Sequence, residues 1–379
     1  MSRRIVIITE IIAPYRIPVF NALARESGID LHVIFLSKTD SSLRQWRVYE
    51  DEIQFSYEVL PSFRRRIGRY NILLNRRVAE ALHNAAPDVI ICGGYNYVSS
   101  WQAMRWATRN RVPFLLWSES TARDRRSRHL MVESLKKLFF RNCAAFVVPG
   151  RSAQDYLHQM GVPRQNIFIA RNAVDIGRFS EMGRKARAKA GRARHELVLP
   201  EKYFLFVGRL VREKGVVDLI QAYGELPQEI RERIGLVFAG DGPMRAELEV
   251  LARDVYPGTI HFAGFIDRDG LAAYYSLAEC IVLPTYSDTW GLVVNEAMAC
   301  GLPVICTRVA GCAVELVQSN GRLIEPGNLP ELRRAMMEIA ADPVLRDGMS
   351  AQSEARSREF SPEAWASGIV EAAHAVGLS

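Results

Sequence analysis

The acidic residues Asp288 and Glu296 are the pair in this chain that most directly suggests chemistry. They lie eight positions apart and flank the turn Trp290–Gly291–Leu292, from which an apolar helix is predicted to run to Gly301. A strand, a glycine turn and a helix N-terminus form an anion site, because free backbone N–H groups and the positive end of the helix dipole face one point. A carboxylate beside such a site is useful when the ligand carries both phosphate and hydroxyl groups, as a nucleotide sugar does.

Two cations follow a second predicted strand, at residues 203–207. Gly208 ends this strand, Arg209 comes next, and Lys214 precedes the following helix. This loop can aim both cations at one diphosphate, and each charge-assisted hydrogen bond contributes about 1.5–3 kcal/mol. Taken alone, the pair reads more simply as two surface residues at a helix start.

Two further turns follow neighbouring predicted strands. The segment Gly240–Pro243 has glycines that permit a tight turn and close approach of a ligand; Asp241 is expected to cap the next helix. The segment His261–Phe265 ends another strand, where we expect a planar base to lie against Phe265. Each turn alone is ordinary, but the four turns in this order are specific as a set.

These turns need strands that bring them to one edge. Apolar strands alternate with amphipathic helices in both halves of the chain, a pattern typical of parallel sheets covered on both faces. We therefore predict an α/β protein with two tandem Rossmann-like domains facing across an interdomain cleft, with ligands at the carboxyl ends of the strands. The predicted strands are 3–9, 31–37, 87–94, 112–120 and 144–150, then 203–210, 234–243, 259–266, 280–285 and 303–307.

Composition places the chain among soluble globular proteins. It has 379 residues, of which 49% are hydrophobic and 24% are charged, and no apolar run reaches the roughly 20 residues that span a bilayer. The apolar stretch Ile5–Ile8 is bounded by Thr9 and Glu10 without a small-residue cleavage site, so we predict a buried first strand, rather than a signal peptide, and a cytoplasmic location. Six cysteines without a C-x-x-C pair indicate reduced, buried thiols rather than disulfides or metal ligands.

Charge is divided unevenly along the chain. Residues 1–195 contain 33 Lys and Arg against 16 Asp and Glu, and the remainder contains 16 against 26. A basic half implies an anionic partner: nucleic acid, an anionic membrane or a phosphorylated substrate. The basic stretches lack the interleaved aromatic residues of a nucleic-acid binder. They are Arg64–Arg66, Arg123–Arg128 and Lys136–Arg141.

The third basic stretch lies in a predicted helix whose apolar side chains can share one face. These are Leu130, Met131, Leu135, Leu138 and Phe139. Core packing explains this face more simply than membrane insertion. The positive charge nevertheless favours docking on an anionic leaflet, at roughly 1 kcal/mol for each basic residue.

With these motifs the chain resembles the retaining glycosyltransferases of family 4, which have the GT-B fold and include bacterial lipopolysaccharide, exopolysaccharide and glycolipid enzymes. The likeness covers nearly the whole chain and includes Asn172–Asp175 at the crossover between domains and the first loop Ala13–Arg16, which certain family members share. It implies that Glu296 binds the ribose and that Arg209 and Lys214 bind the diphosphate of a UDP- or GDP-linked sugar. No other cofactor is implied.

The chain departs from the family pattern at two places. Asp288 stands where the family has glutamate, and its reach is shorter by one carbon–carbon bond, about 1.5 Å. The N-terminal half lacks the glycine-rich first loop of many relatives and has Glu119, not histidine, after its middle strand. We expect Arg16 to touch the diphosphate or an anionic acceptor, and Glu119 to bind a hydroxyl of the donor sugar or acceptor. Either residue is otherwise an ordinary surface group.

The resemblance also implies a division of labour. We expect an acceptor-binding domain at 1–180, a connector at 181–197 and a nucleotide-sugar-binding domain at 198–360, with the C-terminal helix 361–379 packing back on the first domain. The expected catalytic residues are Asp288, Glu119, Arg209 and Lys214. The expected donor-binding residues are Arg209, Lys214, Asp288, Glu296, Gly208, Gly240, Gly242, Phe265, Thr289, Trp290, Gly291 and Leu292. The expected acceptor-side residues are Tyr15, Arg16, Tyr95, Asn96 and Glu119.

The reaction implied is a retaining transfer of the sugar to a hydroxyl of a glycan or lipid-linked acceptor. The two cations would stabilise the leaving diphosphate where another transferase fold uses a metal ion. The segment Asp267–Arg268–Asp269 resembles a D-x-D metal motif, but we predict a loop in which Asp269 caps the helix at 270–277. Two alternatives stay open: a nucleotide-sugar epimerase or hydrolase of the same fold, and a degenerate transferase that serves as a scaffold.

Overall fold

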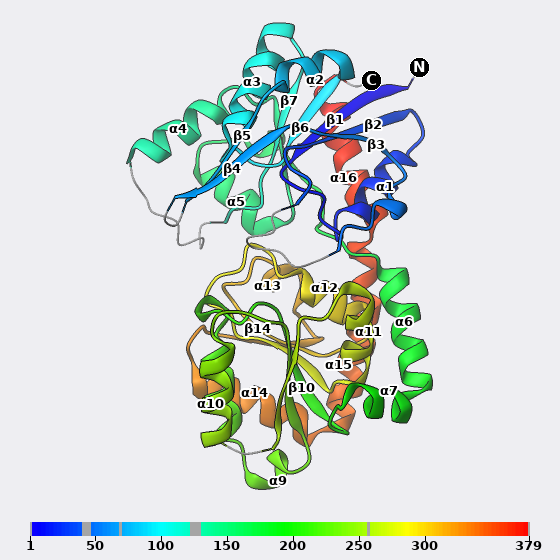
Figure 1. Cartoon of the computed structure of the whole chain (residues 1–379), viewed down its shortest axis with the longest axis vertical. Helices are drawn as coiled ribbons and strands as arrows, with labels where there is room; N and C mark the ends of the chain where they lie inside the picture. The colour runs from blue at the N-terminus through cyan, green and yellow to red at the C-terminus, as the bar shows by residue number, and fades with distance from the viewer. Residues whose placement is uncertain (1, 40–46, 68–69, 122–129, 256–257, 378–379) are drawn as a thin grey trace. The chain divides into compact units, whose positions relative to one another are not determined.

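The computed structural model describes residues 2–39, 47–67, 70–121, 130–255 and 258–377. It divides the chain into two compact units, residues 1–173 with 361–379, and residues 174–360. Each unit contains one open sheet of parallel strands with helices on both faces (Figure 1). The predicted α/β architecture of two Rossmann-like domains is therefore confirmed.

The first unit is built on a seven-stranded sheet with the order β3-β2-β1-β6-β7-β8-β9. The strand order reverses between β1 and β6, and open sheets of this type bind ligands beside such a switch point, at the carboxyl ends of the strands. The prediction omitted the short edge strands β3 and β9. The strands are β1 (Arg3–Thr9), β2 (Ile29–Phe35), β3 (Ser56–Val59), β6 (Val89–Cys92), β7 (Phe114–Trp117), β8 (Ala145–Val148) and β9 (Ile167–Ile169).

Both faces of this sheet are apolar, because successive residues of a strand point to opposite sides. Ile5 and Ile7 of β1 pack toward α1 and α16, whereas Val6 and Ile8 pack on the other face. Trp365 of α16 is fully buried, and its ring centroid lies 5.7 Å from that of Phe20 in α1. The C-terminal helix therefore belongs to the first unit. The helices are α1 (Ile17–Ala24), α2 (Val78–Ala85), α3 (Val98–Asn110), α4 (Leu130–Phe140), α5 (Arg151–Gln159) and α16 (Pro362–Ala375).

The second unit repeats this plan with the strand order β12-β11-β10-β13-β14-β15. Its switch point lies between β10 and β13. Tyr203 and Leu205 of β10 pack on one face and Phe204 and Phe206 on the other. The strands are β10 (Tyr203–Val207), β11 (Gly235–Ala239), β12 (Ile260–Gly264), β13 (Cys280–Leu283), β14 (Val304–Thr307) and β15 (Gly321–Ile324).

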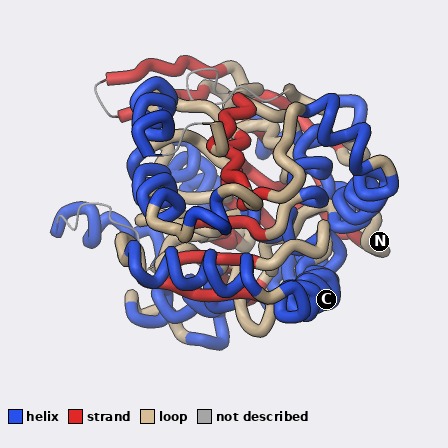
Figure 2. The backbone as a smooth tube through the Cα atoms, turned by 90° about the horizontal axis from the view of Figure 1, so that it is seen from below, coloured by secondary structure: helices blue, strands red, loops and turns tan. Residues whose placement is uncertain are grey.

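Helices flank the second sheet. Figure 2 shows the helices in blue and the strands in red along the backbone. They are α6 (Ile176–Ala188), α7 (Ala190–Leu197), α8 (Val216–Gly224), α9 (Gln228–Arg231), α10 (Arg245–Val255), α11 (Arg268–Leu277), α12 (Leu292–Ala299), α13 (Ala313–Leu316), α14 (Leu329–Ala341) and α15 (Pro343–Ser357). Four single 3-10 turns complete the described elements: η1 (Glu50–Glu52), η2 (Arg164–Asn166), η3 (Arg212–Lys214) and η4 (Arg358–Phe360).

The connector predicted at 181–197 is instead folded into the second unit. It consists of most of α6 and all of α7, and Asp175 caps α6 by accepting a hydrogen bond from the Arg178 N–H at 3.0 Å. Phe179 is buried, and Gly183 lies so close to α11 that an added Cβ would sit 2.3 Å from Ser276 Oγ. The abundant basic residues hid this packing face, because long cationic side chains keep their charge in water while the helix beneath them packs.

Two short strands lie outside both parallel sheets. They are β4 (Ser62–Ile67) and β5 (Tyr70–Asn75), which form a separate antiparallel pair that the prediction missed. No helix in the described ranges is long and apolar enough to cross a bilayer. The cysteines are unpaired, and all but the half-buried Cys143 are buried.

The apolar face predicted around α4 is only partly used in the core. Phe139 and Phe140 are buried, but Leu135 and Leu138 are 52% and 50% exposed. Core packing therefore explains less of this face than the sequence suggested. Side chains of Leu130 and Met131, and the whole basic stretch Arg123–Arg128, lie outside the described residues.

Candidate active site

The switch point of the second sheet brings Lys214 and Asp288 together. Lys214 ends η3 after β10, and Asp288 lies in the loop after the neighbouring strand β13. Lys214 Nζ lies 2.5 Å from Asp288 Oδ2, and the two side chains are only 20% and 16% exposed. The sequence predicted both residues as ligands of the donor, and the structure shows that they form an ion pair with each other.

The rest of the Asp288 loop holds this carboxylate in place. The Trp290 N–H donates to Asp288 Oδ1 at 3.3 Å, and the Gly311 N–H donates to the Asp288 carbonyl at 3.0 Å. Both carboxylate oxygens therefore have a partner. The Trp290 indole is buried and donates to Asn295 Oδ1, so this residue contributes to the site through its backbone. The neighbouring Thr289 is exposed.

The glycine turn and helix N-terminus predicted as an anion site are found at the start of α12. Gly291 precedes the helix with φ 98°, and a Cβ at this position would lie 3.2 Å from Leu283 and 3.3 Å from the Cys312 sulfur. Only glycine combines this backbone angle with so little space. The N–H groups of Leu292 and Val293 open the helix and carry its positive dipole end, whereas the Val294 N–H already donates to the Gly291 carbonyl at 2.9 Å.

Glu296 lies one turn into α12. The Tyr275 O–H donates to Glu296 Oε2 at 2.7 Å. Burial raises the pKa of Glu296 to about 7, although the Tyr275 hydrogen bond and the charge of Arg268 both act in the opposite direction. The pKa of Tyr275 is raised well above its usual value, by burial and by the nearby Glu296 charge.

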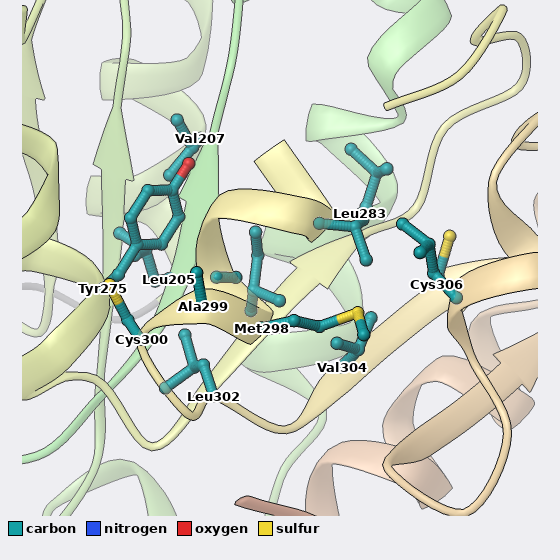
Figure 3. Close-up of a cluster of buried hydrophobic side chains, with 14 of the residues drawn as sticks. Leu205, Val207, Tyr275, Leu283, Met298, Ala299, Cys300, Leu302, Val304 and Cys306 are labelled. Carbon is teal, nitrogen blue, oxygen red and sulfur yellow. The ribbon is translucent and has the colours of Figure 1, made fainter. Parts of the chain in front are cut away.

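Tyr275 was not among the predicted site residues. It is fully buried and belongs to the apolar cluster drawn in Figure 3, beside Leu205 and Val207 of β10. The sequence feature that could have indicated Tyr275 is its position in the apolar helix segment LAAYYSLAE. A tyrosine hydroxyl buried in an apolar cluster needs a hydrogen-bond acceptor.

The glycine turns pack against one another. A Cβ on Gly240 would lie 1.9 Å from the Gly208 carbonyl oxygen, and one on Gly242 would lie 2.5 Å from the carbonyl oxygen of Leu210. The close approach that these glycines permit is therefore between loops, where the sequence suggested a ligand. Asp241 Oδ1 accepts from the Gly242 N–H at 2.7 Å, and Asp241 lies four residues before α10, not at the capping position predicted for it.

Two exposed residues remain available beside these turns. The Arg209 side chain is exposed and, in the part of the chain that the structure describes, makes no hydrogen bond or ion pair. Phe265 follows β12 and is 45% exposed. A free guanidinium and an open aromatic ring suit a diphosphate and a planar base respectively.

The D-x-D segment is used for structure. Asp267, not Asp269, caps α11, accepting from the Gly270 N–H at 2.9 Å. The helix begins two residues earlier than predicted, so Asp269 lies in its first turn and pairs instead with Arg178 of α6 at 2.6 Å. Within the described ranges no cluster of three potential metal ligands occurs.

A second group of polar residues meets at the carboxyl edge of the first sheet. Arg16 follows β1, Glu119 follows β7 and Asn172 follows β9. Arg16 donates from Nη2 to Glu119 Oε1 and from Nη1 to Asn172 Oδ1 at 3.2 Å, and Asn172 Nδ2 donates to the same Glu119 oxygen at 3.2 Å. Asn172 is 1% exposed and was not among the predicted site residues.

Two aromatic rings lie close to the Arg16 guanidinium. Its central carbon lies 4.1 Å from the ring centroid of Trp117 and 5.2 Å from that of Tyr15. Arg16 is only 13% exposed, so the charge expected to meet a diphosphate or anionic acceptor is already paired. Among the described residues nothing hydrogen-bonds to Glu119 Oε2, and this side chain is 29% exposed.

Tyr95 and Asn96 differ from each other. The ring of Tyr95 packs against Phe139 and Phe140, with centroids 6.0 and 5.9 Å away, and the Tyr95 carbonyl accepts from the Trp101 indole. Tyr95 thus supports the core of the first unit. Asn96 is exposed.

Comparison with known proteins agrees with this architecture. Residues 20–178 match the protein family described as "Glycosyltransferase Family 4", and residues 189–356 match the family described as "Glycosyl transferases group 1". The structure is similar over 98% of both chains to sucrose-phosphate synthase from Thermosynechococcus elongatus, with TM-score 0.73 and 22% identity. It is also similar to Anabaena Alr3699/HepE in complex with UDP and glucose, with TM-score 0.76 and 18% identity over 98% of this chain and 99% of that one. These likenesses show the GT-B glycosyltransferase fold.

The chain is also similar in sequence to curated glycosyltransferases. The chain is 28% identical over 163 residues to O-antigen chain mannosyltransferase B from Escherichia coli, which is 42% of each protein. It is 29% identical over 221 residues to D-inositol 3-phosphate glycosyltransferase from Streptomyces bingchenggensis, which is 55% of this chain and 47% of the relative. The chain thus spans about half the length, or less, of these relatives. The two family matches, one in each half of the chain, together support a glycosyltransferase of the family 4 type.

Proposed function

We propose that the chain is a retaining glycosyltransferase that moves a sugar from a nucleotide-diphosphate sugar to a hydroxyl of a glycan or lipid-linked acceptor in the synthesis of a bacterial surface polysaccharide or glycolipid. The observation that carries this proposal is the meeting of Lys214, Asp288 and the start of α12 at one switch point, with Glu296 one turn further along the helix. Cation, helix N-terminus and carboxylate match the diphosphate and the ribose hydroxyls of such a donor.

The donor diphosphate takes the place of Asp288 as partner of Lys214, or shares Lys214 with it. Arg209 is the second cation, and its freedom lets it close on the phosphates. These two charges and the α12 N–H groups stabilise the negative charge that develops on the leaving diphosphate, without a metal ion. Glu296 accepts from the ribose hydroxyls and Phe265 lies against the base.

In the first unit Glu119 binds an acceptor or sugar hydroxyl. Oε1 is already occupied by Arg16 and Asn172, so Oε2 is the atom that accepts from the substrate. Arg16 acts through Glu119 and is a positioning residue. The departing phosphate oxygen takes the proton of the acceptor hydroxyl, which attacks from the same face and so retains the configuration.

The names of relatives and neighbours support the substrate class. One relative is an O-antigen chain mannosyltransferase, another is named D-inositol 3-phosphate glycosyltransferase, and the Anabaena neighbour was solved with UDP and with UDP-glucose. The basic first half suits a lipid-linked acceptor on an anionic membrane, where a cytoplasmic enzyme would bind peripherally.

Calorimetry with a panel of UDP-, GDP- and ADP-sugars tests the donor site. One donor should bind, and Glu296→Ala and Arg209→Ala should each weaken it about tenfold or more, since each removes a hydrogen bond to a charged group. Lys185→Ala, at a 65% exposed side chain of α6, is the matched control and should bind normally. Lack of binding to every donor would favour the scaffold alternative. Release of free nucleoside diphosphate at a rate that no acceptor increases would favour the hydrolase.

A further inference from the structure

The β4–β5 hairpin has two faces of opposite character. Its register pairs Phe63 with Leu74 and Arg65 with Ile72, and directly paired residues of an antiparallel ribbon lie on the same face. These four residues form what we call the hairpin face. Phe63 is 62% exposed, Leu74 42% and Ile72 38%, and Arg65 is also exposed.

The opposite face anchors the hairpin to the first unit. Leu73 is 2% exposed, and the buried Asn75 donates to the Leu36 carbonyl at 2.5 Å and accepts from Ser99 Oγ at 2.8 Å. Arg64 pairs with Glu10 at 3.2 Å. Glu10 follows β1 and Leu36 follows β2, so the hairpin is fixed at the carboxyl edge of the sheet, the edge that also carries Arg16 and Glu119 (Figure 1).

Such a face needs an explanation because it groups large apolar side chains. Single exposed apolar residues are common on protein surfaces, and Val344, 82% exposed at the start of α15, is one of them here. Three apolar side chains on one face of a two-stranded ribbon form a patch, and patches of this kind mark interaction sites.

The charge around this face indicates the kind of partner. Residues 62–77 read SFRRRIGRYNILLNRR, with six arginines and no acidic residue. Arg76 and Arg77, which follow the hairpin, are exposed. Apolar side chains bordered by arginines suit the boundary between acyl chains and anionic headgroups, where burial of apolar area and attraction to the lipid charge add together.

We propose that the hairpin face docks the protein on an anionic lipid bilayer, with Phe63, Ile72 and Leu74 entering the headgroup region and Arg65, Arg76 and Arg77 binding lipid phosphates. Docking in this way turns the carboxyl edge of the first sheet toward the lipid. If the proposed function holds, this orientation presents Glu119 to the hydroxyl of a lipid-linked acceptor.

Cosedimentation of the full chain with vesicles tests this assignment. Binding to phosphatidylcholine vesicles that contain phosphatidylglycerol should exceed binding to pure phosphatidylcholine and should fall as salt increases. Phe63→Ser with Leu74→Ser should lower the affinity about tenfold or more, because each side chain loses favourable apolar burial. Arg65→Glu should lower it several-fold through charge. Val344→Ser is the matched control and should bind like the unmodified protein.

Calorimetry with the nucleotide sugar reports whether each variant is folded and keeps its donor site. Failure of the proposed donor binding can therefore be distinguished from failure of the proposed membrane docking. Equal binding to neutral and anionic vesicles, or unchanged binding by the double Ser variant, would overturn the assignment. Sedimentation velocity provides another decisive outcome. A dimer that the double Ser variant dissociates would make the hairpin face a contact between two copies of the chain. Loss of binding to a single-stranded oligonucleotide in the same variant would make it a nucleic-acid surface.

Discussion

The three carboxylates Glu119, Asp288 and Glu296 are held by two different kinds of partner. In the first unit a cation holds Glu119, and in the second unit a cation likewise holds Asp288. Glu296 has instead the neutral hydroxyl of Tyr275, in a buried setting that raises its pKa to about 7. A carboxylate that faces a cation is positioned before any ligand arrives. Ionisation of a carboxylate that faces a phenol in an apolar cluster costs free energy. Hydrogen bonds donated by a ligand offset this cost.

This difference suggests different tasks. The ion pairs give fixed geometry, which suits groups that orient a reacting hydroxyl or a departing phosphate. Glu296 gives affinity that depends on its ionisation. Changes to the ion-paired cations Arg16 and Lys214 should therefore act mainly on turnover, and changes to Glu296 mainly on donor affinity.

The largest effect is expected for Lys214→Ala. This change removes one cation from the diphosphate and leaves Asp288 without its ion-pair partner, so kcat should fall about 10²–10³-fold, the range for loss of one donor to a developing negative charge. The fall in kcat can be measured without an acceptor as the rate of slow donor hydrolysis. The released nucleoside diphosphate is the product that is monitored. Lys214→Arg should recover part of the rate. A normal rate in Lys214→Ala would mean that the Lys214–Asp288 pair is structural.

Arg16→Gln should have the next largest effect. Loss of the charge frees Glu119 from its fixed position, and transfer to the acceptor should fall roughly 10–100-fold, as for loss of a charge-assisted hydrogen bond. Because Arg16 is paired within the first unit, the Kd for the nucleotide sugar should not change. Arg16→Lys should restore part of kcat. A weaker Kd would instead mean that Arg16 binds the diphosphate, as the sequence suggested.

The pH dependence of donor affinity separates Glu296 from the other two acids. Ribose hydroxyls bind the ionised carboxylate, so with a pKa of about 7 the affinity should fall about tenfold between pH 8 and pH 6. In Glu296→Gln the affinity should be weaker at pH 8 and nearly constant over this range. Calorimetry with a nucleotide sugar, whose diphosphate does not titrate here, measures both. The same slope in both proteins would assign the titration to another group.

The sequence predicted the strands and the loop residues better than their partners. Apolar periodicity located β10, β11 and β13 because each is buried on both faces. The spacing of Asp288 and Glu296 indicated the loop and helix in which we propose the donor site. Spacing along the chain does not show that Lys214 faces Asp288, because that contact depends on the order of strands in the sheet. Asn172 and Tyr275 were missed for the same reason, since each acquires its role from a residue far away in the sequence.

The same logic explains the errors at 181–197 and at the β4–β5 hairpin. In the first segment the basic residues of α6 and α7 resemble a linker, and their packing partner, α11, comes much later in the chain. In the second, Leu73 and Asn75 face the first unit while Phe63 and Leu74 face outward, an alternation that the neighbouring arginines obscure. Local patterns show which segments are apolar, whereas long-range contacts decide which face is buried.

The smallest expected effect is on stability, and it has the opposite sign to the effect on binding. Folding raises the pKa of Glu296 from about 4.3 in an unfolded chain to about 7, so the folded state binds the extra proton between these values. The contribution of Glu296 to the free energy of unfolding is therefore present below pH 4.3 and is lost as pH rises to 7. Above pH 7, Glu296→Gln should be more stable than the unmodified protein by on the order of 1–2 kcal/mol, allowing for the partial exposure of this side chain. Urea unfolding at pH 8 and pH 5 measures the difference, which should shrink at the lower pH. A less stable Gln variant at pH 8 would show that the ionised Glu296 already has compensating partners before the donor binds, and the contrast with Glu119 and Asp288 would then disappear.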